Sequence, residues 1–136
     1  MKILTFITII SAIAIAGCVG QSQILANETP VTATVEMSEN GVSPPTVTIA
    51  EGGTVTFRST GTKPVWPASA VHPLHRQYPE GGGCIGSFFD ACEGIEPGDE
   101  WNFTFNHAGV WGYHDHLNPP HRGVVEVKEV TTENQA

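Results

Sequence analysis

Apolar and polar residues alternate along several short segments of this chain, which is the pattern of half-buried β-strands. The alternation is weak in residues 32–37 and clear in residues 46–49, 54–57 and 100–105. These segments are rich in Val, Thr and Phe, and Gly or Pro residues bound them, as is typical of strands. From residue 18 onward, no segment of useful length carries apolar residues at helical spacing. The pattern predicts an all-β chain.

Two further alternating segments, residues 110–116 and 124–130, continue the pattern towards the C-terminus. Glycine-containing turn signals separate the strands, at residues 51–53 and 106–109. About seven or eight short strands joined by such turns predict one antiparallel β-sandwich or barrel, spanning residues 31–130. A disordered tail is expected at residues 131–136.

Residues 60–99 interrupt this regular pattern, because Gly, Pro, His and Cys dominate there and only very short strands can be drawn. A loop of this length in a small domain needs a function and something that holds it in place. Five large apolar residues are available to pack it against the sandwich: Trp66, Leu74, Tyr78, Phe88 and Phe89.

The N-terminal residues read as an export signal. Lys2 precedes a short apolar run that ends in Ile15-Ala16-Gly17-Cys18. These last four residues resemble a lipobox, so residues 1–17 are predicted to be a lipoprotein signal peptide and Cys18 the lipidated residue; an ordinary signal peptide with an incidental cysteine is the alternative. A flexible tether is expected over residues 18–30. The protein is thus predicted to be exported and anchored to a membrane, at the outer face of the cytoplasmic membrane or in the periplasm.

Cys84 and Cys92 lie eight residues apart in the long loop. In an exported protein a disulfide is the default state of such a pair, and closing so short a loop would contribute on the order of 2.5 kcal/mol. The alternative is a pair of metal-binding thiolates, for which a tighter spacing is usual. The spacing favours a disulfide that pins the loop.

The chain is acidic, with 14 Asp and Glu against 6 Lys and Arg and a net charge of −8. No basic patch is present in the sequence, so we expect no nucleic-acid partner. An acidic surface attracts cations or a basic protein partner.

Histidine is as frequent as all basic residues together, with six in the chain. His114, His116 and His121 fall within eight residues, with Asp115 between the first two, and the long loop adds a pair three residues apart, His72 and His75. Imidazole and carboxylate groups are ligands of first-row transition metals. We therefore expect a metal site, while the sixth histidine, His107, is interpreted as a surface residue.

Three segments of the chain resemble the cupredoxins, the small copper proteins of amicyanin and plastocyanin type. Residues 47–57 look like the early hairpin of that family, residues 101–113 like its penultimate strand pair, and residues 113–127 like a short ligand loop with the closing strand. The resemblance implies a Greek-key β-sandwich and copper as the cofactor.

The ligand positions depart from the family pattern. By the resemblance, the early His falls near Val65 or Trp66, the Cys on Asp115, the second His on Asn118 and the Met on His121. Without a thiolate ligand there is no blue type 1 site. Either the ancestral site has decayed and the domain serves interactions, or histidines have built another site; five histidines in two loops at one end of the sandwich favour the second.

The predicted ligands are His72 and His75 from the long loop, with His116 and either His114 or His121. Strand alternation places His114 and His116 on one face. Asp115 is expected either as a ligand or as the acceptor that orients a ligating imidazole. Cu(II) has the highest intrinsic affinity for such a type 2-like site, with zinc as a competitor.

The sequence thus predicts a copper-binding lipoprotein that acts as carrier, buffer or redox accessory, and that meets a redox or copper-delivery protein partner. A small copper enzyme and a metal-free interaction domain are the alternatives.

Overall fold

The computed structural model describes residues 28–131 of the 136-residue chain. The predicted signal peptide, the lipidated Cys18 and nearly all of the predicted tether and tail lie outside these residues. Within residues 28–131, no helix is long and apolar enough to cross a bilayer.

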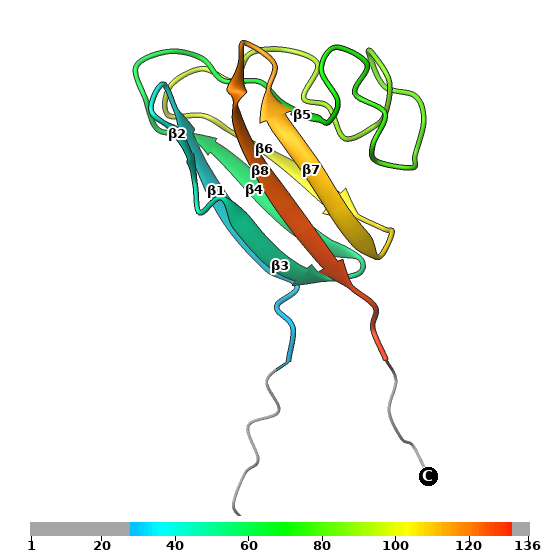
Figure 1. The fold of residues 1–136 in the computed structure, drawn as a ribbon. Coiled ribbons are helices and arrows are strands. Elements are labelled where there is room, and N and C mark those ends of the chain that lie inside the picture. Colours follow the sequence, from blue (N-terminus) through cyan, green and yellow to red (C-terminus); the bar gives the residue numbers. More distant parts are fainter. Residues whose placement is uncertain (1–27, 132–136) are drawn as a thin grey trace, which may run out of the picture.

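Eight strands form two four-stranded sheets that pack face to face (Figure 1). The first sheet has the order β2-β1-β4-β6 and the second the order β3-β8-β7-β5. The strands are β1 (Thr32–Ser38), β2 (Gly41–Ser43), β3 (Thr46–Ala50), β4 (Gly53–Ser59), β5 (Pro67–Ser69), β6 (Glu100–Phe105), β7 (Gly109–Asp115) and β8 (Asn118–Lys128). The predicted all-β sandwich is therefore confirmed.

Both sheets are mixed, whereas the pattern of turns predicted antiparallel pairing. β1 pairs with β4 in parallel, and β3 pairs with β8 in parallel. The reason is the path of the chain: after the β1–β2 hairpin it crosses to the second sheet as β3 and returns to the first as β4. Alternation specifies which side chains face the core but not the direction of the neighbouring strand.

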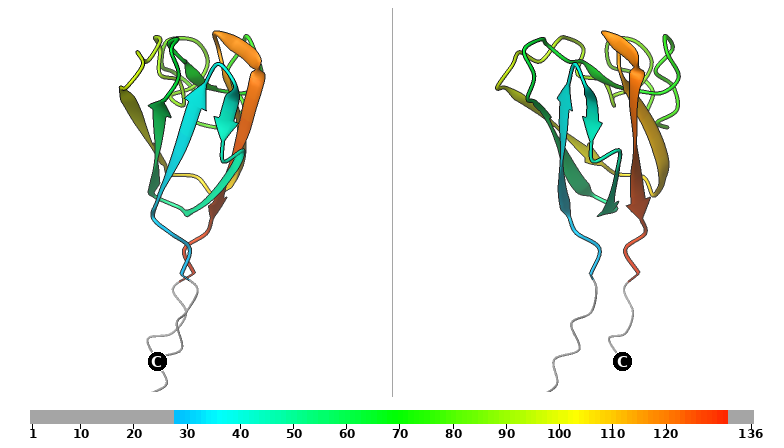
Figure 2. Two further views of the ribbon diagram at one scale, coloured as in Figure 1. Left: turned by 90° about the vertical axis from the view of Figure 1, so that its left-hand side faces the viewer. Right: turned by 60° about the vertical axis from the view of Figure 1, so that its left-hand side comes forward.

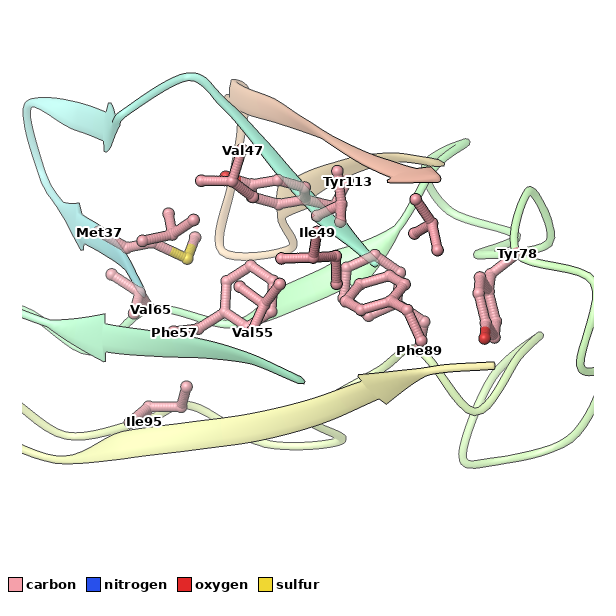
Figure 3. Packing of buried hydrophobic residues seen from close by; sticks show 14 residues of the cluster. Met37, Val47, Ile49, Val55, Phe57, Val65, Tyr78, Phe89, Ile95 and Tyr113 are labelled. Carbon is pink, nitrogen blue, oxygen red and sulfur yellow. The ribbon is translucent and has the colours of Figure 1, made fainter. Parts of the chain in front are cut away.

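The core lies between the sheets and follows the alternation of the strands (Figure 3). In β4, Val55 and Phe57 are fully buried while Arg58 is exposed. Phe57 contacts Tyr113 of β7 edge to face, with ring centroids 5.1 Å apart. Each such aromatic residue contributes roughly 2–3 kcal/mol by removing its apolar surface from water.

The long segment between β5 and β6 closes one side of the sandwich. Its buried Tyr78 and Phe89 pack against aromatic residues of β6, with Phe89 5.0 Å and Tyr78 5.3 Å from Phe103 between ring centroids. The predicted Cys84–Cys92 disulfide is present, with a Cα–Cα distance of 5.6 Å. The other two apolar residues of this segment that were expected to pack it down, Leu74 and Phe88, are exposed instead.

The loops of this segment gather at the end of the sandwich where β7 ends and β8 begins (Figure 1). Two further views show that residues 28–31 and 129–131 emerge together at the opposite end (Figure 2). The sandwich therefore separates its loop-rich end from both ends of the described chain.

Candidate metal centre

Four histidine side chains meet at the loop-rich end. His72 and His75 come from the segment after β5, and His114 and His116 come from the end of β7 and the turn after it. If one ring nitrogen is taken from each histidine, these four nitrogens all lie within 4.8 Å of one another. Two pairs separated by about 40 residues in the sequence are thus brought to one place by the pairing of β5 with β7.

The four rings surround a common point. His72 Nδ1 lies 3.3 Å from His114 Nε2, and His75 Nε2 lies 2.9 Å from His116 Nδ1. Ring centroids of neighbouring members are 4.8 to 5.2 Å apart. Two opposite pairs, His72 with His75 and His114 with His116, are 6.2 Å apart. Such nitrogen pairs can share a hydrogen bond, and together the four rings offer one nitrogen each, which is a kind of donor that first-row transition metals bind.

The end of β7 directs His114 and His116 to the same side. Asp115 is the last residue of β7, and the Tyr113 ring lies in the core, so the neighbouring His114 points outward. The backbone N–H of His116 donates to the Trp66 carbonyl at 2.7 Å, and the two rings lie 4.5 Å apart between centroids. The structure thus agrees with the predicted face, because the strand ends just before His116.

His75 is fully buried, and its backbone has a left-handed conformation with φ +50°. Its N–H donates to the Val71 carbonyl at 2.9 Å, which closes a turn over residues 71–75. Gly86 packs directly against the Leu74 carbonyl, where a Cβ atom would collide with it. This close approach holds the disulfide loop against the turn that carries His72 and His75.

Asp90 orients His75. Its Oδ2 lies 2.5 Å from His75 Nδ1, and both side chains are fully buried. Its Oδ1 accepts hydrogen bonds from Trp66 Nε1 at 2.6 Å and from the Cys92 N–H at 2.8 Å. With Oδ1 occupied by these two donors, Oδ2 is placed to accept a hydrogen bond from the Nδ1–H group of His75. The Nε2 atom of His75 then keeps its lone pair for a metal, as in the carboxylate–histidine pairs of many metal sites.

Sequence reasoning did not single out Asp90; it gave Asp115 either as a ligand or as the acceptor that orients a ligating imidazole. In the structure, Asp115 Oδ1 accepts the backbone N–H groups of Trp66 at 2.9 Å and Leu117 at 3.0 Å. It therefore fixes the turn after β7 and lies outside the group of four histidines. A signal for Asp90 was present in the sequence: it is the acidic residue that directly follows the apolar pair Phe88-Phe89 within the disulfide loop.

The structure does not bring His121 into the group of four histidines. Its ring lies beside the side-chain amide of Asn118, with nitrogen distances of 3.2 Å. His107 lies near Glu80, with an N–O distance of 2.9 Å, and is partly exposed, as expected for a surface residue. Cys84 and Cys92 are joined to each other, so they offer no thiolate to the site.

Burial and the neighbouring positive charges lower the pKa values of His114, in β7, and His116, in the turn after it. Burial lowers the pKa of His114 to about 4, and the nearby charges of His75, His72, His116 and Arg122 act in the same direction. Burial also lowers the pKa of His116, with further contributions from His75 and His72. Neutral imidazole is the form that binds metal ions, so the lowered pKa values of His114 and His116 favour metal binding by these two side chains.

We expect the copper-free protein to lose stability as the pH falls from about 6.5 towards 4. His114 is protonated in the unfolded chain over this range but neutral in the folded protein, so protons favour unfolding. The contribution is present above the unfolded pKa and is of the order of 3 kcal/mol at most. Melting temperatures measured between pH 7.5 and 4.5 test this. The variant His114→Gln should show a flatter dependence, and equal slopes would contradict the assignment.

Comparison with known proteins places the fold. No family model matches the chain, and no curated protein matches it. Among solved structures, a purple cupredoxin from Nitrosopumilus maritimus is 20% identical with a TM-score of 0.57, covering 71% of this chain and 99% of that one. Amicyanin from Paracoccus versutus is 24% identical with a TM-score of 0.55, covering 76% and 87%.

A copper-containing nitrite reductase from Thermus scotoductus SA-01 is 19% identical with a TM-score of 0.53; the match covers 76% of this chain and 24% of that one. At sequence identities this low, the similarity to these structures shows a shared fold. The chain has the cupredoxin fold, with a group of four histidines and no free cysteine among its described residues.

Proposed function

We propose that this protein binds one copper ion through His72, His75, His114 and His116 and serves outside the cytoplasm as a copper carrier or buffer. The observation that carries the proposal is the approach of four imidazole nitrogens to within 4.8 Å of one another. The cupredoxin fold adds support, since the solved neighbours include copper proteins by name. Export and the lipid anchor at Cys18 rest on the N-terminal sequence.

The donor set favours copper over other metals. Four imidazoles without a thiolate suit Cu(II), which has the highest affinity among the divalent first-row ions, and zinc is the natural competitor. Bound copper would supply one-electron redox chemistry. The chain's own contribution is to hold four neutral nitrogens in place, with Asp90 fixing the tautomer of His75.

The exposure of the ligands favours a carrier over a fast electron-transfer protein. His75 and His114 are buried, whereas His72 is exposed and His116 is partly exposed. An ion at the group can therefore be reached from one side by a partner or a chelator. Because residues 28–31 and 129–131 emerge at the opposite end of the sandwich, an anchored protein would present this side to a copper-delivery or redox partner (Figure 2).

The proposal is tested by titrating the purified full chain, disulfide intact, with Cu(II) under electron paramagnetic resonance. We expect a stoichiometric signal that saturates at one ion per chain and shows coupling to nitrogen. Copper at 100 times its Kd should also raise the free energy of unfolding by about 2.7 kcal/mol. A chain that binds no stoichiometric copper and shows no thermal shift is instead a metal-free interaction domain.

A further inference from the structure

A pocket of about 270 Å³ opens beside the four histidines. His72 and His114 form part of its wall, together with Ala70, Val71, Tyr113, Pro119 and Arg122. His72 Nδ1 and His114 Nε2 are 3.3 Å apart, so an ion held by these nitrogens would border the pocket. The pocket is therefore a place where a second molecule could reach the metal without displacing a histidine.

Arg122 gives this pocket a positive charge. It pairs in register with His114 across β7 and β8, which places both residues side by side on the outward face of the sheet. Its Nε donates to the Pro119 carbonyl at 3.0 Å. Within residues 28–131 no carboxylate lies at ion-pair distance from it, although Arg58 and Lys128 are paired with Glu100 and Glu126.

Arg76 and Lys63 also lack a carboxylate at ion-pair distance among the described residues, so what distinguishes Arg122 is its place in the wall of the pocket beside His72 and His114. A guanidinium whose terminal N–H groups lack a protein acceptor is suited to bind an oxygen- or nitrogen-bearing anion. Arg122 lies opposite His114 in the register of β7 and β8, and both residues line the same pocket, so its charge acts on anything bound there.

The proposed metal site also attracts anions. Neutral imidazoles do not balance the two positive charges of Cu(II), and the one carboxylate hydrogen-bonded to a member of the group, among the described residues, is Asp90. Bound cations are often the largest local charges in a site. The ion and Arg122 would therefore act together on anything in the pocket.

The size of the pocket limits its occupant. At about 30 Å³ per water molecule, the pocket holds roughly nine waters, which is room for a small anion and a few waters. Pockets for drug-sized ligands begin at about 300 Å³, and this pocket lies just below that range, which suits a small ligand.

We propose that the pocket between His72, His114 and Arg122 binds a small monovalent anion next to the copper ion, with Arg122 as its pairing group. The inference rests on the proposed copper site. It gives that site a position for an external ligand, which a copper enzyme acting on a small anion would require.

The test uses sodium azide as the probe and the copper-loaded full chain as the target. Copper stoichiometry is measured first, and azide binding is then followed by the azide-to-copper absorption and by electron paramagnetic resonance. Saturable azide binding is expected for the unmodified protein. Arg122→Gln should weaken it by roughly tenfold or more with copper stoichiometry unchanged, because a charge-assisted hydrogen bond is lost. Arg122→Lys should recover part of the affinity.

Arg76→Gln is the matched control. Arg76 follows His75 in the sequence and is exposed, but it does not line the pocket. Its replacement removes the same charge and should change azide affinity by less than about twofold, which separates local pairing from general attraction. Equal weakening by both variants, or no effect of Arg122→Gln, would overturn the proposal. If the copper-loaded protein binds no azide, the proposed anion site is wrong and the proposed copper function stands. If the protein binds no copper, both proposals are wrong.

Discussion

Replacing His72 and His116 together by alanine is expected to abolish stoichiometric copper binding while the protein stays folded. These are the two more exposed members of the histidine group, so their removal opens no buried cavity. The buried pair of His75 and Asp90 keeps its hydrogen bond. Two of four ligands are lost, and the affinity should fall by more than about 100-fold, since losing even the partner of a ligand costs about 10–100-fold.

Competition titrations with a copper chelator measure this loss, and melting of the copper-free variant checks the fold. His121→Ala is the matched control: it removes the same imidazole chemistry five residues after His116, from a side chain that lies outside the group. Its affinity should equal that of the unmodified protein. Full copper affinity in the double variant, or a large loss on His121→Ala, would show that the ligands are others than those assigned.

Asp90→Asn is expected to lower copper affinity by about 10–100-fold with all four histidines present. Asparagine has nearly the same shape, and its oxygen can still accept from Trp66 Nε1 and the Cys92 N–H. Its amide group then faces His75 Nδ1 as a donor, which moves the imidazole proton to Nε2. A metal can then bind Nε2 only after this nitrogen loses its proton, or after the ring gives up its hydrogen bond to the new asparagine so that the proton can return to Nδ1.

The readout that separates orientation from simple destabilisation is the tautomer of His75, measured by nitrogen NMR on the copper-free protein. The unmodified protein should carry the proton on Nδ1, and Asp90→Asn should shift it. Asp115→Asn is the control, because the oxygen that accepts the Trp66 and Leu117 N–H groups is kept in asparagine. Wild-type affinity and an unchanged tautomer in Asp90→Asn would contradict the assigned role.

Local alternation was sufficient to predict most of the fold. Residues such as Val55 and Phe57 face the core because side chains alternate along a strand, and that depends on the sequence alone. The cysteine spacing and the export signal likewise indicated a disulfide before the structure showed it. Histidine spacing singled out the two segments whose side chains the structure brings together. Each of these signals depends on residues that lie close together in the sequence.

The directions of β1 against β4 and of β3 against β8 depended on the path of the chain between sheets, which alternation does not record. The choice of Asp90 over Asp115 required the long segment to fold back so that residue 90 meets residue 75. His121 was excluded because its side chain lies beside Asn118 and not with the four rings. Residue type and spacing determined which chemistry this protein carries, and long-range packing decided which atoms share one site.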